Sequence, residues 1–301
     1  MKISFNHIIN PFPSGEETEH GIASKITYAS LEVAVQQAKT EGVDVQVSAV
    51  ILKGDELSVK SPAILAGVLK RTVQDLYNLR PKKPLPLISD ILNMGALSFE
   101  SSHIIYTNMD IAVQPNFYIK LREVIENFSN ENSPFIIYRR NIPSNFNSID
   151  QLSEMYTQEG TISEGFDCFV FPSKQLSDLR LGNCCIGAAH FDLLLFISLD
   201  AASGFNAIKI KYPSLTFHIG NNIEWSANIE YIEHNLRESI EAISKMRLLY
   251  VIPKDSHFHN IEKRHFKRNM SQLSRLNRKI KKWPVVGGVV LKLKRFIGAN
   301  H

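Results

Sequence analysis

The sequence has 301 residues and a net charge of +4, and 44% of its residues are hydrophobic, 21% charged and 9% aromatic. This composition is typical of a globular protein with a sizeable core, and it excludes a disordered, collagen-like or coiled-coil chain. No apolar run approaches the ~18–20 residues of a transmembrane helix, residues 1–17 lack a signal-peptide core, and the three cysteines show no CxxC spacing. We therefore expect a soluble, cytoplasmic protein with reduced thiols.

Short apolar strand patterns alternate with helical patterns through the first 250 residues. Strands are predicted over residues 3–9, 43–51, 103–108, 135–138, 168–171 and 207–212. Helices are predicted around residues 26–38 and over residues 62–78, 88–99, 116–128 and 190–203. Such alternation is typical of βαβ units, which build an α/β fold with a mostly parallel sheet and helices on both faces. Ligands of such sheets bind outside the carboxyl ends of the strands.

The basic residues concentrate at the end of the chain. Residues 245–301 hold 15 Lys or Arg and 2 Asp or Glu, whereas the first 244 residues hold 19 and 28. Residues 261–280 and 285–297 mix these cations with apolar residues. Two interpretations stay open: basic amphipathic helices on an anionic membrane surface, or helices packed on the domain with a solvated basic face. We predict one domain over residues 1–250 and a basic helical tail over residues 251–301.

The most informative motif is Asn108-Met109-Asp110, which follows the apolar strand predicted over residues 103–108. Residues i and i+2 at a strand end point to the same side, so the Asn108 amide oxygen and the Asp110 carboxylate can converge on one hard cation such as Mg²⁺ or Mn²⁺. The competing explanation is turn formation, because strands often end in Asn or Asp.

The order of motifs resembles the nucleotide-sugar-dependent glycosyltransferases of the GT-A fold. The segment HIIYTNMDIAVQPNFY is similar to their D-x-D signature region, and PLPLISDILNMGALSFESS is similar to the helix before it that contacts the nucleotide sugar. Downstream, EGFDCFVFPSK resembles the acceptor-side strand, IGAAHFDLLL the segment with a late catalytic carboxylate, and PSLTFHIGNN the region that supplies a histidine. The resemblance covers about residues 1–225 and implies a Rossmann-like, mostly parallel mixed sheet with helices on both faces.

The resemblance implies a nucleotide-sugar donor held by several polar residues. Asn10 and Pro11 leave the first strand at its carboxyl end, Asp90 lies early in a predicted helix, and Asn108 and Asp110 form the signature. Ordinary alternatives exist for each: turn chemistry for Asn10 and Pro11, and a favourable helix-dipole contact for Asp90.

A divalent cation, Mn²⁺ or Mg²⁺, is the implied cofactor, with Asn108, Asp110 and His218 as its candidate ligands. The chain departs from the D-x-D pattern because its first position is Asn, and one charge fewer weakens the expected metal site. A histidine near a strand is also commonly a satisfied structural group. Arg139 and Arg140 end the strand FIIYRR, where they could neutralise phosphate, although a solvated charge pair is the ordinary explanation.

Two carboxylates are candidates for acid–base chemistry. Asp192 opens a very apolar helix and could take the proton from an acceptor hydroxyl, or it could serve only as a carboxylate at a helix N-terminus. Asp167 is the rival base, and it follows Phe166, whose ring could stack on an acceptor sugar. We prefer Asp192 as the base, with Phe166 and Asp167 binding the acceptor.

The leading hypothesis is a cytoplasmic glycosyltransferase of polysaccharide biosynthesis, moving a sugar from a nucleotide diphosphate donor to a glycan or lipid-linked acceptor. The basic tail would make it peripheral at the inner face of the membrane. The alternative is a non-catalytic GT-A-like protein that binds nucleotide sugar or glycan, with Asn108 marking lost metal chemistry. A nucleic-acid-binding tail is a third possibility, but the acidic body and the lack of a known nucleic-acid-binding module argue against it.

Overall fold

The computed structural model describes residues 2–127, 132–220 and 228–266. Within this part of the chain a nine-stranded sheet has the order β3-β2-β1-β4-β7-β6-β9-β5, with β8 beside β6. The strands are β1 (Ser4–Ile9), β2 (Asp44–Leu52), β3 (Ala63–Leu69), β4 (His103–Thr107), β5 (Ala112–Val113), β6 (Phe135–Ile142), β7 (Thr161–Pro172), β8 (Ile208–Ile210) and β9 (Thr216–Ile219).

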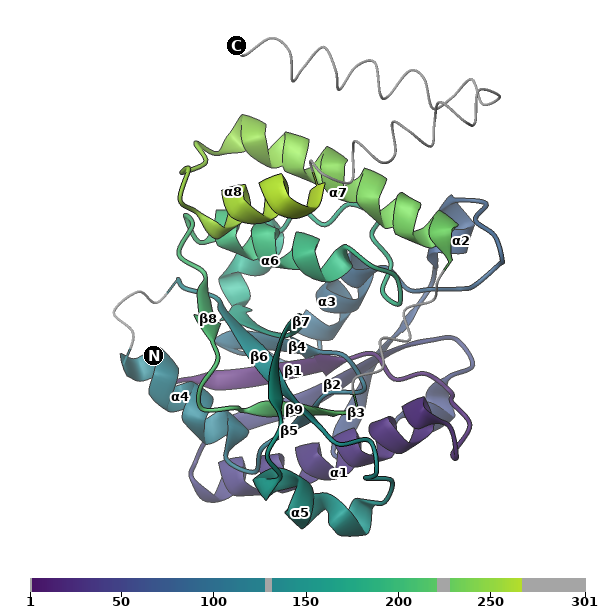
Figure 1. Ribbon diagram of the computed structural model, residues 1–301, viewed down its shortest axis with the longest axis vertical. Helices are drawn as coiled ribbons and strands as arrows, with labels where there is room; N and C mark the ends of the chain where they lie inside the picture. Colours follow the sequence, from purple (N-terminus) through teal and green to yellow (C-terminus); the bar gives the residue numbers. More distant parts are fainter. Residues whose placement is uncertain (1, 128–131, 221–227, 267–301) are drawn as a thin grey trace.

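Helices cover both faces of this sheet (Figure 1). The α-helices are α1 (Glu19–Thr40), α2 (Val73–Leu76), α3 (Ile88–Ala96), α4 (Phe117–Asn127), α5 (Leu152–Thr157), α6 (Phe191–Ala202), α7 (Ile229–Leu249) and α8 (His257–Ile261). Short 3-10 segments are η1 (Glu56–Ser58), η2 (Ile149–Gln151) and η3 (Ser173–Asp178), and a π-helical turn, η4 (Glu262–Phe266), follows α8. One core joins α3, α6, α7 and α8 to the sheet, and another joins α1 and α4 to its opposite face.

The sheet changes character between β4 and β7. Strands β1, β2, β3 and β4 are mutually parallel, whereas β7 runs antiparallel to both β4 and β6. Strand β6 is parallel to β8 and β9, and β9 is antiparallel to β5. This arrangement confirms the predicted α/β fold with a mostly parallel, mixed sheet and helices on both faces.

The central strands are apolar because both of their faces are covered. Strand β1 is buried from Phe5 to Ile9, as expected for a parallel strand that lies between two helical layers. Helix α6 is also apolar on most sides, since it lies between the sheet and the layer formed by α7 and α8 (Figure 1).

Three segments differ from the sequence-based expectation. The helix predicted over residues 62–78 is wrong: its first part is the edge strand β3, and only Val73–Leu76 is helical. A short apolar run fits either element, and the open edge of β2 supplies hydrogen-bond partners that favour the strand. Helix α7 and strand β9 were not predicted. Phe258, Ile261 and Phe266 belong to the main core, while residues 267–301 of the predicted tail lie outside the described residues.

In the described part of the chain, no helix combines the length and apolar character that crossing a bilayer requires.

Candidate active site

A tight turn after β4 carries the Asn108–Asp110 motif. The backbone N–H of Ile111 donates to the carbonyl of Asn108 at 3.2 Å and closes this turn. The Asn108 amide oxygen accepts a hydrogen bond from the Tyr106 hydroxyl at 3.3 Å, and its amide nitrogen donates to Asp167 Oδ1 at 3.1 Å. The turn therefore holds the Asn108 side chain toward the neighbouring strand β7.

Asp167 receives its second partner from β6. Thr107 and Ile137 both pair with Cys168 of β7, so Asp167 lies between the end of β4 and the middle of β6. Arg139 Nη1 donates to Asp167 Oδ2 at 2.7 Å, and Arg139 Nε donates to Asn141 Oδ1 at 3.0 Å. Burial raises the pKa of Asp167, although the charge of Arg139 opposes this rise. The pair is a buried ion pair rather than a surface contact.

Asp110 faces His218, which the last strands of the sheet bring to the same edge. Asp110 Oδ2 and His218 Nε2 are 3.3 Å apart. Burial alone would raise the pKa of Asp110, but the hydrogen bond and charge of His218, together with Arg139, hold it below its usual range. His218 Nδ1 donates to the carbonyl of Gly220 at 3.0 Å, and the φ of 76° at Gly220 is a left-handed conformation that favours glycine.

These residues fit a divalent cation. Because the Gly220 carbonyl can only accept, the Nδ1 of His218 carries a proton, so its Nε2 meets Asp110 through either a second proton or a cation. Asp110 Oδ1 is buried and has no hydrogen-bond partner among the described residues. Neighbouring ligands of a small octahedral cation lie about 3 Å apart, close to the observed separation of the two side chains.

The predicted metal ligands are a carboxylate, an imidazole and an amide. Residues 2–127, 132–220 and 228–266 contain no group of three or more His, Cys, Asp and Glu side chains placed to hold a metal ion. Only Asp110 and His218 of the predicted ligands are of these types, and the third is Asn108. A cation here would therefore complete its coordination with water and ligand phosphates.

Asp192 lies in the first turn of α6, two residues after His190, whose backbone is left-handed with a φ of 82°. Such a conformation is uncommon for a residue other than glycine and concentrates at functional sites. Burial raises the pKa of Asp192 to about 7, a hydrogen bond from the backbone of Leu193 opposes the rise, and the charge of Asp167 adds to it. A carboxylate with a pKa near neutrality is well suited to accept a proton.

Asn10 and Pro11 lie at the same edge of the sheet as the Asn108 turn. Ile8 pairs with Tyr106 across β1 and β4, so Asn10 and Asn108 occupy equivalent positions two residues further along. The Asn10 amide donates to the carbonyl of Val50 at 2.6 Å, and both Asn10 and Pro11 are buried. The Asn10 side chain therefore also supports the end of β2.

The predicted site residues Asp90 and Phe166 have partners outside this cluster. Arg71 donates to both carboxylate oxygens of Asp90, at 2.7 and 2.9 Å. The Phe166 ring lies 4.9 Å from the ring of Phe196, and the Lys209 ammonium lies 5.6 Å from the Phe166 centroid. Among the described residues, no hydrogen bond or ion pair joins Asp90 or Phe166 to Asp110 or Asp167.

Arg139 is the site residue that sequence reasoning undervalued. The expectation of a solvated pair with Arg140 is wrong, because Arg139 is ion-paired with Asp167 and Arg140 donates to the carbonyls of Met155 and Tyr156, both at 3.2 Å. The signal was the period of two along FIIYRR, which places neighbouring residues on opposite sides of a strand.

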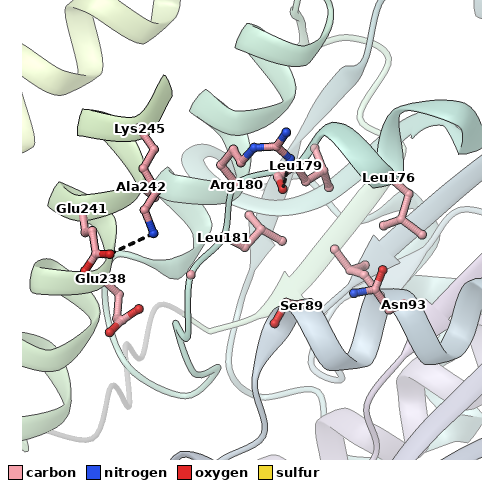
Figure 2. A pocket seen from close by; sticks show the side chains of 12 residues that line it. Ser89, Asn93, Leu176, Leu179, Arg180, Leu181, Glu238, Glu241, Ala242 and Lys245 are labelled. Atoms are coloured by element: carbon pink, nitrogen blue, oxygen red, sulfur yellow. Dashed lines mark hydrogen bonds and ion pairs between the residues drawn. The ribbon is translucent and has the colours of Figure 1, made fainter. Parts of the chain in front are cut away.

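A separate pocket of about 250 Å³ lies between α3, the segment around η3 and α7 (Figure 2). Ser89 and Asn93 line one side, Arg180 another, and Glu238 and Lys245 a third. None of the predicted site residues lines this pocket. Its position therefore does not coincide with the cluster around Asp110, Asp167 and Asp192.

No known protein-family profile and no curated protein sequence matches this chain. Solved structures do match. Residues 1–349 of TarS from S. aureus, in complex with UDP-GlcNAc, have a TM-score of 0.50 at 12% identity, covering 80% of this chain and 66% of that one. The Mycobacterium tuberculosis glucosyl-3-phosphoglycerate synthase with Mn²⁺, UDP-glucose and phosphoglyceric acid gives a TM-score of 0.47 at 11% identity, covering 84% and 82%. A Drosophila β1,4-galactosyltransferase 7 complex with manganese, UDP-Gal and xylobiose gives 0.42 at 8% identity, covering 75% of each chain.

The similarity to TarS shows that this chain has the GT-A glycosyltransferase fold. The chain spans about two thirds of the TarS fragment that it matches. At 12% identity the likeness concerns the fold, so the chemistry must be argued from the residues of this chain.

Proposed function

We propose that this protein is a glycosyltransferase that moves a sugar from a nucleoside diphosphate donor to a glycan or lipid-linked acceptor. The observation that carries the proposal is the convergence of the Asn108–Asp110 turn, Asp167, His218 and Asp192 at one edge of a GT-A sheet. The fold is shared with TarS, whose crystal structure contains UDP-GlcNAc.

The donor side would consist of Asn10, Pro11, Asp90, Asn108 and Asp110. Asn10 and Pro11 line the carboxyl edge of the sheet, where ligands of open α/β sheets bind. Asp90 would reach the nucleotide after exchanging or sharing its Arg71 contact. A divalent cation held by Asn108, Asp110 and His218 would neutralise the diphosphate of the donor.

Asp192 would act as the general base. In the proposed transfer an acceptor hydroxyl oxygen bonds to the anomeric carbon of the donor sugar, and the bond to the diphosphate breaks. The hydroxyl proton passes to the Asp192 carboxylate, while the electron pair of the broken bond leaves with the nucleoside diphosphate. The pKa of about 7 supports this role, since the carboxylate is ionised and still basic near neutral pH.

The acceptor side would include Asp167 and Phe166. Asp167 lies close enough to raise the pKa of Asp192, so a sugar hydroxyl bound to Asp167 would lie near the base. Arg139 and Asn108 hold one oxygen each of the Asp167 carboxylate and thereby fix its orientation. Phe166 is half-buried beside Phe196, so part of its ring remains accessible for contact with a sugar.

A direct test is the release of nucleoside diphosphate from a panel of UDP-, GDP- and dTDP-sugars, with Mn²⁺ or Mg²⁺ and candidate glycan acceptors. We expect one donor class to be consumed by the wild-type protein, and consumption to fall in Asp192→Asn. If the protein binds a donor saturably but does not consume it with any acceptor tested, the result would instead support a non-catalytic protein that binds nucleotide sugars. Absence of binding to every donor would contradict the proposal.

A further inference from the structure

Three aliphatic side chains at the carboxyl end of α7 face solvent. Leu248 is 69% exposed, Leu249 is 59% exposed and Val251 is 95% exposed. Tyr250 and Ile252, which lie among them in sequence, pack against the main core and fix this segment in place. We call Leu248, Leu249 and Val251 the α7 patch. Clustered exposed aliphatic residues of this kind mark an interaction surface more often than isolated ones do.

Cations adjoin the α7 patch in the sequence and in the segment that is ion-paired to the end of α7. Arg247 Nε donates to Glu262 Oε1 at 3.0 Å, and this ion pair joins the end of α7 to η4. Lys263 and Arg264 follow Glu262 and are exposed, as is Lys254 in the connecting segment. Among the described residues these three cations have no carboxylate within ion-pair distance. The only exposed acid between Leu249 and Phe266 is Asp255.

The basic character continues beyond this layer in the sequence. Residues 267–301 contain 10 Lys or Arg and no Asp or Glu. They follow Phe266, which is buried and whose ring lies 5.9 Å from that of His190. Phe266, the last described residue before them in sequence, follows α8, which lies on the side of α6 that faces away from the sheet (Figure 1).

We propose that the α7 patch, together with Lys254, Lys263 and Arg264, docks on the surface of an anionic lipid bilayer. Aliphatic side chains suit the boundary between headgroups and acyl chains, and the cations suit anionic headgroups. A second copy of this chain would bring like charges together, and so would the basic residues 267–301. A nucleic acid matches the charge, but its phosphate backbone offers nothing apolar for leucine and valine.

Docking would also fix where the candidate active site lies relative to the membrane. The backbone N–H of Phe258, at the start of α8, donates a hydrogen bond to the Asp200 carboxylate near the end of α6, whereas Phe266 packs on His190 at the start of α6. The α8–η4 segment thus runs along α6. Its last residue, Phe266, contacts His190, which precedes Asp192 by two residues in the sequence. On the proposed function, this arrangement would suit a lipid-linked acceptor, but docking itself does not depend on transfer activity.

The test is co-sedimentation of the full chain with phosphatidylglycerol–phosphatidylcholine vesicles and with vesicles of phosphatidylcholine alone. We expect binding only to the anionic vesicles. The triple variant Leu248→Ser, Leu249→Ser, Val251→Ser should lower the partition coefficient about tenfold or more at physiological salt. A variant with Lys254→Glu, Lys263→Glu and Arg264→Glu should lose about fivefold per cation at low salt and less at high salt.

The matched control is Leu57→Ser with Leu97→Ser, because these leucines are 87% and 89% exposed at other places on the surface. This control should bind like the wild type, and unchanged donor consumption and melting temperature would show that all variants are folded. Equal binding to neutral vesicles, or no effect of the α7 triple variant, would overturn the proposal. Preferential binding to duplex DNA that ignores the aliphatic substitutions would also overturn it and would favour a nucleic-acid partner.

Discussion

The Nε2 atom of His218 lies 3.3 Å from Oδ2 of Asp110, although one residue belongs to β9 and the other to the turn after β4. The Gly220 carbonyl fixes the proton on the other ring nitrogen of His218, so this contact contains either a proton or a cation. Protons and metal ions should therefore compete for the same place, and metal affinity at this site should weaken as the pH falls.

The first prediction concerns donor binding at this contact. A nucleoside diphosphate with Mn²⁺ or Mg²⁺ should raise the melting temperature of the wild-type protein by mass action. Asp110→Ala should abolish this gain while keeping the ligand-free melting temperature near that of the wild type. Asp178→Ala, which removes an exposed carboxylate elsewhere, is the control and should keep the gain. An equal gain in Asp110→Ala would remove this site from consideration.

The second prediction uses the departure from the D-x-D pattern. Asn108→Asp replaces an amide donor by a carboxylate that lies beside the carboxylate of Asp167, so the metal-free protein should melt at a lower temperature. Mn²⁺ should restore the loss and give a larger rise than in the wild type, because the added charge strengthens cation binding. Scanning calorimetry across a Mn²⁺ series measures both effects. A variant indifferent to Mn²⁺ would argue against a cation at Asn108.

The third prediction concerns the base. Asp192→Asn should lower turnover by about 10²–10⁴-fold with donor binding unchanged, because the amide cannot accept a proton. In the wild type, kcat/KM should rise with pH through an apparent pKa of about 7, as Asp192 becomes ionised. Asp167→Asn is the comparison, since it removes the rival carboxylate. Near-normal turnover in Asp192→Asn with a severe loss in Asp167→Asn would transfer the role to Asp167.

The fourth prediction tests the buried ion pair. Arg139→Met leaves Asp167 buried beside an apolar side chain and should lower the free energy of unfolding by about 3–5 kcal/mol. Adding Asp167→Asn removes the uncompensated charge and should recover most of this loss. Urea denaturation of the two single variants and the double variant measures the coupling. Additive losses would show that the two side chains do not stabilise each other.

The fifth prediction concerns acid sensitivity. His7 is fully buried between the Tyr118 hydroxyl and the Thr107 hydroxyl, each at 2.8 Å, and burial lowers its pKa to about 3. The unfolded chain takes up a proton below pH 6.5 and the folded chain does not. His7 therefore contributes stability above that pH, and the contribution falls by about 1.4 kcal/mol per pH unit toward pH 3.

A His7→Gln variant should accordingly show a smaller loss of stability than the wild type between pH 6.5 and pH 4.5, measured by urea denaturation. The comparison is needed because Asp192, whose pKa is raised, contributes an opposite slope over this range. The same pH dependence in both proteins would mean that folding does not change the pKa of His7.

Local sequence patterns predicted most central elements of the fold but few of the tertiary contacts. Apolar runs suffice for β1 and β4, which are buried along almost their whole length. The alternation that predicted β2 indicates a half-buried strand, whereas its residues from Val47 to Ile51 are all buried. The edge strand β3 failed because its exposed half carries apolar residues such as Ile64 and Leu65. Helix α7 was missed although buried positions recur at helical spacing along it, which is a signal present in the sequence.

The same distinction between local patterns and tertiary contacts applies to the candidate site. The residue types at Asn108, Asp110 and Asp192 can be read locally, because each stands where an apolar segment begins or ends. The pairing of Arg139 with Asp167 cannot, because it depends on β7 lying between β4 and β6 and on the register shift between Ile137 and Arg139. Non-local strand order is set by packing of the whole sheet rather than by either strand alone.

The change from parallel to antiparallel pairing at β4 and β7 also separates most of the proposed donor residues from the proposed acceptor residues. Every residue proposed for the donor except His218 precedes β5, and every residue proposed for the acceptor or the base follows α5. Substitutions among the residues before β5 should therefore act mainly on the choice of donor, and substitutions after α5 mainly on the choice of acceptor.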